Sequence, residues 1–145
     1  MTDNNLILVC PFCSTTNRVP RARLGDGPSC GKCKKKLLSS HPLELNGAQL
    51  DALMKKDELP LLVDFWAAWC GPCQQMAPSF KSAAALAGPG VRFAKLDTEA
   101  YPQQAAQHQI RSLPTLALFI NGKEIARRMG VMSEQQILGW IKTHV

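Results

Sequence analysis

The chain reads LLVDFWAAWCGPC from Leu61 to Cys73, an apolar run that leads directly into a pair of cysteines. A short run of large apolar residues is typical of a buried strand, so residues 61–66 are expected to form one. Pro72 suits the first turn of a helix, where its missing N–H group is not needed. Cys70 is therefore expected to lie where a strand ends and a helix begins.

This position favours redox chemistry at the pair. A cysteine reacts as a thiolate, and the first N–H groups of a helix, with the positive end of its dipole, stabilise that form. Cys73 lies one helical turn later, close enough to close a disulfide, and is expected to be the more buried of the two. We therefore expect Cys70 to attack and Cys73 to resolve. Asp64 is an acid inside an apolar strand, which is costly unless the acid is used; a satisfied structural carboxylate is the alternative.

The other four cysteines have different surroundings. Cys10 and Cys13 form one Cys-x-x-Cys pair, and after sixteen residues Cys30 and Cys33 form another. This spacing is typical of a four-cysteine zinc site. Ligand sets made only of thiolates suit zinc or an iron centre, and zinc is the commoner choice. Disulfides or free thiols remain the alternative at these four positions, including a secreted protein with three structural disulfides.

Composition divides the chain into two unequal parts. Residues 1–36 are rich in Cys, Gly, Pro, Arg and Lys, with few apolar residues after Val9. Such a segment needs a metal or a crosslink to fold. We therefore predict a zinc-binding domain over residues 1–40 and a second domain over residues 41–145. No apolar stretch approaches the length that spans a bilayer, and no signal sequence is recognisable, so we expect a cytoplasmic protein with no membrane partner.

The second domain alternates between helical and strand patterns. Beyond the strand at residues 61–66, helices are expected at 46–56, 71–87 (with Pro78 near its start), 101–109 and from Ser133, and strands at 91–96, 115–120 and 124–128. Asn121-Gly122 is a strong signal for a tight hairpin turn, and Ser133 with Gln136 fits a capping box. The order predicts an α/β fold: three layers, α/β/α, around a central mixed sheet.

The quoted segment resembles the active site of the thioredoxin family. The similarity continues through Ala77-Pro78, Ala94–Asp97, residues 110–115 and residues 119–123, and covers about residues 43–145. It implies a thiol–disulfide oxidoreductase with a thioredoxin-like fold. With the four-cysteine segment in front, nearly the whole chain resembles the zinc-containing second type of bacterial thioredoxin.

The resemblance also implies roles for individual residues. Asp64 would accept the proton of Cys73, Lys95 would pair with that acid, and Pro114 would be a cis-proline facing the disulfide. The substrate groove would be lined by Trp69, Gly71, Pro72, Ser112, Leu113, Pro114 and Gly130. Many thioredoxins have glycine where this chain has Ser112 and lysine where it has Gln74, which leaves target preference open. Trp66 is expected to pack in the core beside the site rather than to be catalytic, and Trp140 is expected in the core.

The same resemblance implies cofactors and partners. We expect one structural zinc on Cys10, Cys13, Cys30 and Cys33, and no bound organic cofactor. Disulfide-containing proteins would be the substrates. Thioredoxin reductase would return the Cys70/Cys73 pair to the dithiol and would use NADPH, so that this chain uses NADPH only indirectly. The protein is expected to be a monomer.

Charge is concentrated in the cysteine-rich part. Residues 1–45 carry seven Lys/Arg against three Asp/Glu, and residues 46–145 carry ten against eight. Lys34-Lys35-Lys36 is consistent with a nucleic-acid contact, but only Phe12 is available for base stacking, so a solvated basic turn is favoured. Two alternative functions remain: a zinc-ribbon module that binds a protein or nucleic acid, and a zinc-based redox sensor. The three histidines are expected at the surface: His41, His108 and His144.

Overall fold

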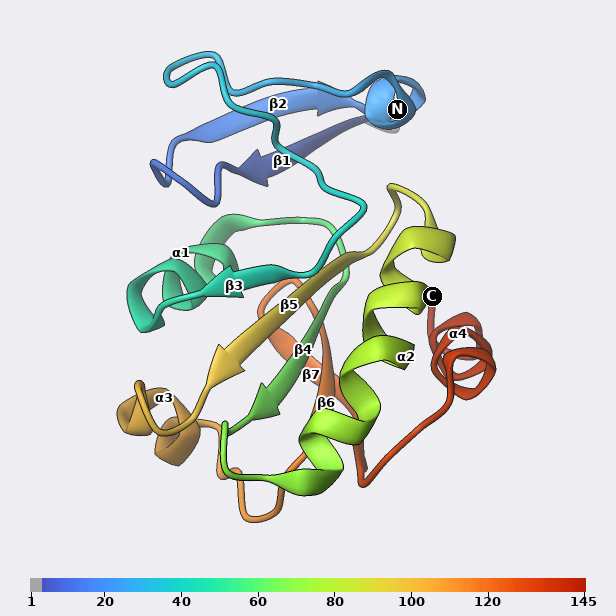
Figure 1. Cartoon of the computed structure of the whole chain (residues 1–145). Helices are drawn as coiled ribbons and strands as arrows, with labels where there is room; N and C mark the ends of the chain where they lie inside the picture. Colours follow the sequence, from blue (N-terminus) through green and yellow to red (C-terminus); the bar gives the residue numbers. More distant parts are fainter. Residues whose placement is uncertain (1–3) are drawn as a thin grey trace.

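The computed structural model describes residues 4–145, which form a small amino-terminal head packed on a larger body (Figure 1). We call residues 4–40 the head and residues 41–145 the body. In the head, β1 (Asn5–Val9) and β2 (Thr16–Pro20) pair antiparallel and lead into the 3-10 helix η1 (Arg21–Asp26). No strand was expected here from the sequence, because each strand is short and β2 is mostly polar.

The body contains one five-stranded mixed sheet in the order β3-β5-β4-β6-β7. The central strands β5 and β4 run parallel, β3 is parallel to β5, and β6 and β7 are added antiparallel. The strands are β3 (Leu43–Leu45), β4 (Leu61–Trp66), β5 (Arg92–Asp97), β6 (Thr115–Ile120) and β7 (Lys123–Met129). The edge strand β3 was not predicted, since three residues are too few to show a period.

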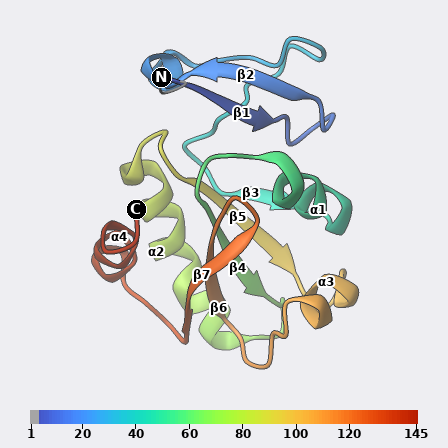
Figure 2. The same ribbon diagram turned by 180° about the vertical axis from the view of Figure 1, so that it is seen from behind.

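Helices pack on both faces of the sheet, which confirms the predicted three-layer α/β/α fold (Figures 1 and 2). The helices are α1 (Gly47–Lys56), α2 (Gly71–Ala87), α3 (Pro102–Gln107) and α4 (Glu134–Lys142). One core, which includes Leu50 and Phe65, lies on the α1 side, and the other, which includes Phe80 and Ile137, lies on the α2/α4 side. No helix in residues 4–145 is long and apolar enough to cross a membrane.

Capping boxes start two of these helices, of which the one at Ser133 was expected. Ser133 accepts a hydrogen bond from the Gln136 N–H group, and Gln136 in turn accepts one from the Ser133 N–H group. Asn46 and Gln49 form the same reciprocal capping box at α1. Each box satisfies N–H groups that a helix leaves without partners at its start.

The head has a small core of its own, contrary to the expectation that it has too few apolar residues to form one. Leu6, Leu8, Val19 and Leu37 are buried together with Cys10 and Cys30. Leu59 of the body joins this cluster, while Val9 of the head packs into the body core. The head is therefore built partly on the surface of the body.

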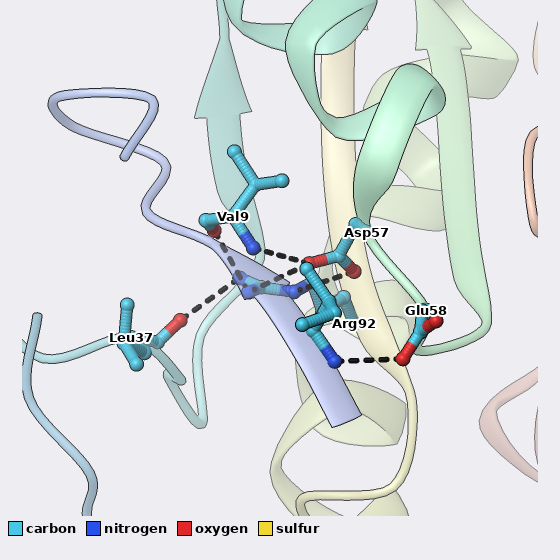
Figure 3. Close-up of polar contacts among 6 residues, drawn as sticks. Val9, Leu37, Asp57, Glu58 and Arg92 are labelled. Atoms are coloured by element: carbon cyan, nitrogen blue, oxygen red, sulfur yellow. Dashed lines mark hydrogen bonds and ion pairs between the residues drawn. The ribbon is translucent and has the colours of Figure 1, made fainter. Parts of the chain in front are cut away.

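A buried ion pair fastens the head to the body (Figure 3). The Arg92 guanidinium donates to both carboxylate oxygens of Asp57, at 3.1 and 3.2 Å, and both side chains are 2% exposed. The same guanidinium donates to the carbonyl oxygens of Leu37 (2.8 Å) and Val9 (2.9 Å). Asp57 also accepts the Val9 N–H group at 2.8 Å. We call these four residues the joint.

The joint and the Cys-x-x-Cys pair of the body lie at opposite ends of the sheet. Arg92 is the first residue of β5, whereas Cys70 follows the carboxyl end of β4. In Figure 1 the head lies at the top, where β5 begins, and the start of α2 lies at the bottom. The head therefore leaves the reactive end of the body uncovered.

Candidate active site and metal centre

Cys70 and Cys73 are joined as a disulfide at the start of α2. Cys70 is the residue that caps the helix, and its Sγ accepts the Cys73 N–H group at 3.1 Å. A helix start places N–H donors and positive potential at this sulfur, which favours a thiolate once the bond is reduced. The expected difference in burial is small in this oxidised form, since Cys70 is 4% exposed and Cys73 is 3% exposed.

The surface next to the disulfide comes from three separate segments. Leu113 packs against the cysteines, the Leu113–Pro114 peptide bond is cis, and the Gly130 N–H group donates to the Pro114 carbonyl at 3.0 Å. Trp69 is 69% exposed beside Cys70. Ser112 is exposed, and Gly71 and Pro72 begin α2. These loops bring the residues predicted for a groove to the same end of the sheet as the disulfide.

Asp64 lies in the middle of β4, and its side chain has no hydrogen-bond partner. The residue is 1% exposed, and neither carboxylate oxygen has a donor within residues 4–145. Burial raises the pKa of Asp64 to about 7, although the nearby positive charge of Lys95 opposes this rise. An unpartnered buried carboxyl that titrates near neutral pH is a feature of functional sites rather than of structural ones.

Lys95 lies directly opposite Asp64 on β5 but does not bind it. The Lys95 Nζ atom is 4.7 Å from the centre of the Trp66 ring, within the range of a cation–π contact. Trp66 is half-buried and packs beside the cysteines, as expected.

The four cysteines of the head converge in one cluster. Their Sγ atoms all lie within 4.8 Å of one another, and the Cys10–Cys33 and Cys13–Cys30 pairs are each 3.6 Å apart. Tetrahedral zinc with four thiolates at about 2.3 Å places its sulfurs about 3.8 Å apart. The four sulfurs therefore fit a tetrahedral metal site.

The two halves of this cluster are near copies of each other. In each half the N–H group four residues after the first cysteine donates to that cysteine's carbonyl: Ser14 to Cys10 at 2.9 Å, and Lys34 to Cys30 at 3.0 Å. Ser14 and Lys34 both have positive φ, at 64° and 69°. Backbone N–H groups, chiefly that of Cys33, lower the pKa of Cys30 to about 6, whereas burial raises the pKa of Cys10 to about 11. The metal needs all four cysteines as thiolates.

Comparison with known proteins finds a matching family for each of the two parts of the chain. The family described as Thioredoxin matches residues 41–143, and the one described as Thioredoxin 2, N-terminal, a zinc ribbon, matches residues 9–35. The chain belongs to the thioredoxin family. Like other thioredoxins it is a thiol–disulfide oxidoreductase, with the Cys70–Cys73 disulfide at the active-site position.

Similar thioredoxins include curated and solved examples. Thioredoxin C-3 of Corynebacterium nephridii is 42% identical over 136 residues, which cover 94% of this chain and 93% of that one. The thioredoxin of Haemophilus influenzae is 33% identical and covers 73% of this chain and 99% of its own. The solved structure of a mutant thioredoxin from Halobacterium salinarum NRC-1 superposes with a TM-score of 0.66 at 30% identity, over 74% of this chain and 93% of that chain.

Two exposed apolar residues of this thioredoxin were not singled out from the sequence. Met129 and Val131 flank Gly130 and are 65% and 43% exposed, so apolar side chains lie at the surface on both sides of this glycine. Two apolar residues around the glycine that matches the family groove are the signal that was missed.

One histidine of this thioredoxin is not where it was expected. His41 and His144 are exposed, but His108 lies between the rings of Phe65 and Phe119, at 5.7 and 5.4 Å, and its Nε2 has no partner within residues 4–145. Burial lowers the pKa of His108. Sequence spacing does not show this packing, because the two phenylalanines belong to β4 and β6.

Proposed function

We propose that Cys70 is the attacking thiol of a protein-disulfide reductase and that Cys73 resolves the reaction. The Cys70 thiolate attacks one sulfur of a target disulfide and releases the other as a thiolate. Cys73 then gives up its proton and attacks Cys70, which closes the Cys70–Cys73 disulfide and releases the second target thiol. Two electrons pass from the dithiol to the target, and the disulfide present here is the oxidised product. The observation that carries this proposal is the sulfur of Cys70 at the helix start.

Asp64 is proposed as the group that accepts the Cys73 proton, with Lys95 as the cation that influences it. The support is the isolation of the carboxyl, whose burial brings its pKa to about 7. A base with a pKa near the working pH is effective in proton transfer. The transfer can run through an intervening water.

The residues at the groove are proposed to bind the target chain. Trp69 presents a large exposed apolar surface beside the disulfide, and the loop before β6 presents Ser112 and Leu113 with the cis-Pro114 bond. Gly71 and Pro72 begin the helix under the attacking sulfur, and Gly130 closes the groove against Pro114. Proteins that contain disulfides are the proposed substrates, and thioredoxin reductase with NADPH the proposed source of electrons.

For the head, we propose one structural zinc ion held by Cys10, Cys13, Cys30 and Cys33. The support is the donor set and the spacing of the four sulfurs. Bound zinc would link β1 to the segment after η1 and add metal binding energy to a small core. The residue ranges of the two family matches also support a domain boundary near residue 40. We further propose that the protein is a cytoplasmic monomer without a nucleic-acid partner.

The cysteine roles are tested by Cys70→Ser and Cys73→Ser in an insulin-reduction assay. We expect no turnover from either variant. Cys73→Ser should in addition trap targets as stable mixed disulfides, whereas Cys70→Ser should not. Full turnover by either variant would overturn the assignment.

Thiol and zinc counts under native reducing conditions provide the control for these variants. The parent protein should show two titratable thiols and one zinc, and each variant should lose one thiol and keep its zinc. Loss of zinc from Cys70→Ser would mean that the two cysteine sets are not separate. Four further titratable thiols and no zinc in the parent would contradict the metal site.

A further inference from the structure

Lys95 lies between two carboxylates in one row across the sheet. Asp64 on β4 and Glu44 on β3 are both directly opposite Lys95 in the strand register. Directly paired residues of neighbouring strands project from the same face, and neighbouring strands lie about 5 Å apart. The row therefore places one cation between two acids on the face that α2 covers.

The two acids have opposite surroundings. Asp64 is buried without a partner, whereas Glu44 is exposed. Among residues 4–145 the Lys95 ammonium forms no ion pair with either acid within 4.0 Å, and instead lies over the Trp66 ring. The Lys95 ammonium, the cation that faces Asp64, therefore does not contact the Asp64 carboxyl.

The solvent-accessible space lies on the Glu44 side of the row. Glu44 and Lys95 together line two surface hollows, of about 710 and about 480 Å³. Helix α2 borders the first through Ala77 and Lys81, and Trp66 borders the second. Water in these hollows can hydrate the ammonium and bridge it to Glu44, since attraction between such charges persists over several ångströms.

We propose that Glu44 and Trp66 act as positioning residues that hold the Lys95 ammonium away from Asp64, so that the buried carboxyl stays without a cation partner. This inference rests on the proposed role of Asp64 as the proton acceptor. A carboxylate that bound the ammonium directly would be a weaker base toward Cys73. Glu44 and Trp66 thereby keep Asp64 effective near neutral pH.

Other charged groups around Asp64 do not share this geometry. On β5, Asp97 is paired with Trp66 and lines the hollow of about 480 Å³ together with Lys95, but one of its carboxylate oxygens accepts the Glu99 N–H group at 2.9 Å. From α2, Cys73 belongs to the disulfide and Lys81 borders one hollow. On β6 the residue opposite Asp64 is the apolar Leu116, and beyond it the exposed Arg128 of β7 ends the row. Within the described strands, only Glu44 is paired with Lys95 on the side away from Asp64.

The test is an NMR titration that follows the Asp64 side-chain carboxyl in the oxidised protein. The midpoint is compared between the parent and Glu44→Gln. Without Glu44 the ammonium should move toward Asp64, and the midpoint should fall by about 0.5 to 1 pH unit. In a Lys95→Met background, Glu44→Gln should move it by only about 0.3 unit, the direct effect of a charge two strands away. Trp66→Leu should lower the midpoint as well, and Trp66→Phe, which keeps a ring face, should restore it.

Asp26→Asn is the matched control, because it removes the same charge from an exposed position in the head and should leave the midpoint unchanged. An unchanged midpoint in Glu44→Gln would overturn the proposal, and so would equal shifts with and without Lys95. The titration reports on the Asp64 carboxyl and not on target reduction. A failure of this positioning proposal can therefore be told apart from a failure of the proposed function. The proposed function would fail if Asp64→Asn reduced targets at the parent rate.

Discussion

Two buried aspartates, Asp57 in the joint and Asp64 in the active site, lie seven positions apart in sequence and have opposite surroundings. Asp57 accepts hydrogen bonds from Val9 and Arg92, and Asp64 accepts none from any residue between 4 and 145. Burial raises the pKa of both carboxyls, but only at Asp57 do an adjacent guanidinium and several hydrogen bonds oppose that rise. The carboxylate with partners joins the head to the body, and the one without partners fits the proton transfer proposed for Asp64.

The sign of the stability effect at Asp64 follows from its pKa. The folded-state pKa is raised from 3.8 to about 7, so the folded protein binds this proton more tightly than the unfolded chain. Between these two values the contribution of Asp64 to stability falls as pH rises, and above about pH 7 the full penalty for a buried charge is present. Asp57 instead forms a buried ion pair with Arg92, and breaking this pair lowers the stability of the folded protein.

The largest expected effect comes from breaking the joint with Arg92→Leu. This change leaves the Asp57 carboxylate and the carbonyl oxygens of Val9 and Leu37 buried without their donor. We expect the free energy of unfolding to fall by about 3–5 kcal/mol, measured by urea denaturation of the zinc-loaded protein at pH 7. Arg128→Leu, at an exposed arginine of β7, should cost less than about 0.5 kcal/mol. Equal losses in the two variants would show that the buried pair does not hold the head.

The second effect has the opposite sign and comes from Asp64→Asn. Because the variant has no carboxyl to ionise, its stability relative to the parent should rise by about 3–4 kcal/mol between pH 4 and pH 8. Measuring this difference across pH cancels the constant cost of a buried amide. Reduction of targets at pH 7 should slow by about 10- to 100-fold if Asp64 is the proton acceptor. A difference that does not change with pH would mean that Asp64 has an ordinary pKa.

The smallest effect is expected at the exposed rim of the joint, from Glu58→Ala. The Glu58 carboxylate accepts the Ile7 N–H group at 2.7 Å, close to Arg92 and Asp57 but open to water (Figure 3). Water can replace this bond, so we expect a loss of about 0.5–1 kcal/mol in the same urea experiment. A loss of unfolding free energy as large as that of Arg92→Leu would show that the exposed Glu58 bond contributes as much as the buried ion pair.

The cysteine pair at the active-site position could be predicted because its signals are local. The Cys-x-x-Cys spacing, the proline in the first helical turn and the apolar strand before it all act within a dozen residues. The four-cysteine cluster could be predicted for the same reason, since each half is a short loop with its own hydrogen bonds. The strands β1, β2 and β3 were missed because three to five residues carry too little periodicity.

The joint was invisible to sequence reasoning because its bonds connect distant positions. Arg92 sits in a strand whose alternation was correctly predicted, yet its guanidinium binds residues 35, 55 and 83 positions away. A lone arginine at the start of a strand is ordinarily exposed. Only the packing of the head over the amino end of β5 buries it.

The sequence by itself determined the catalytic pair, the four-cysteine set and the layered α/β fold, because spacing, capping and apolar period are properties of neighbouring residues. The tertiary structure alone decided which buried acid has a partner and which does not. Asp57 meets Arg92 and the head, whereas Asp64 faces a lysine held over Trp66. The physical reason is that the energy of a buried charge depends on the donors that the folded chain brings within hydrogen-bond distance.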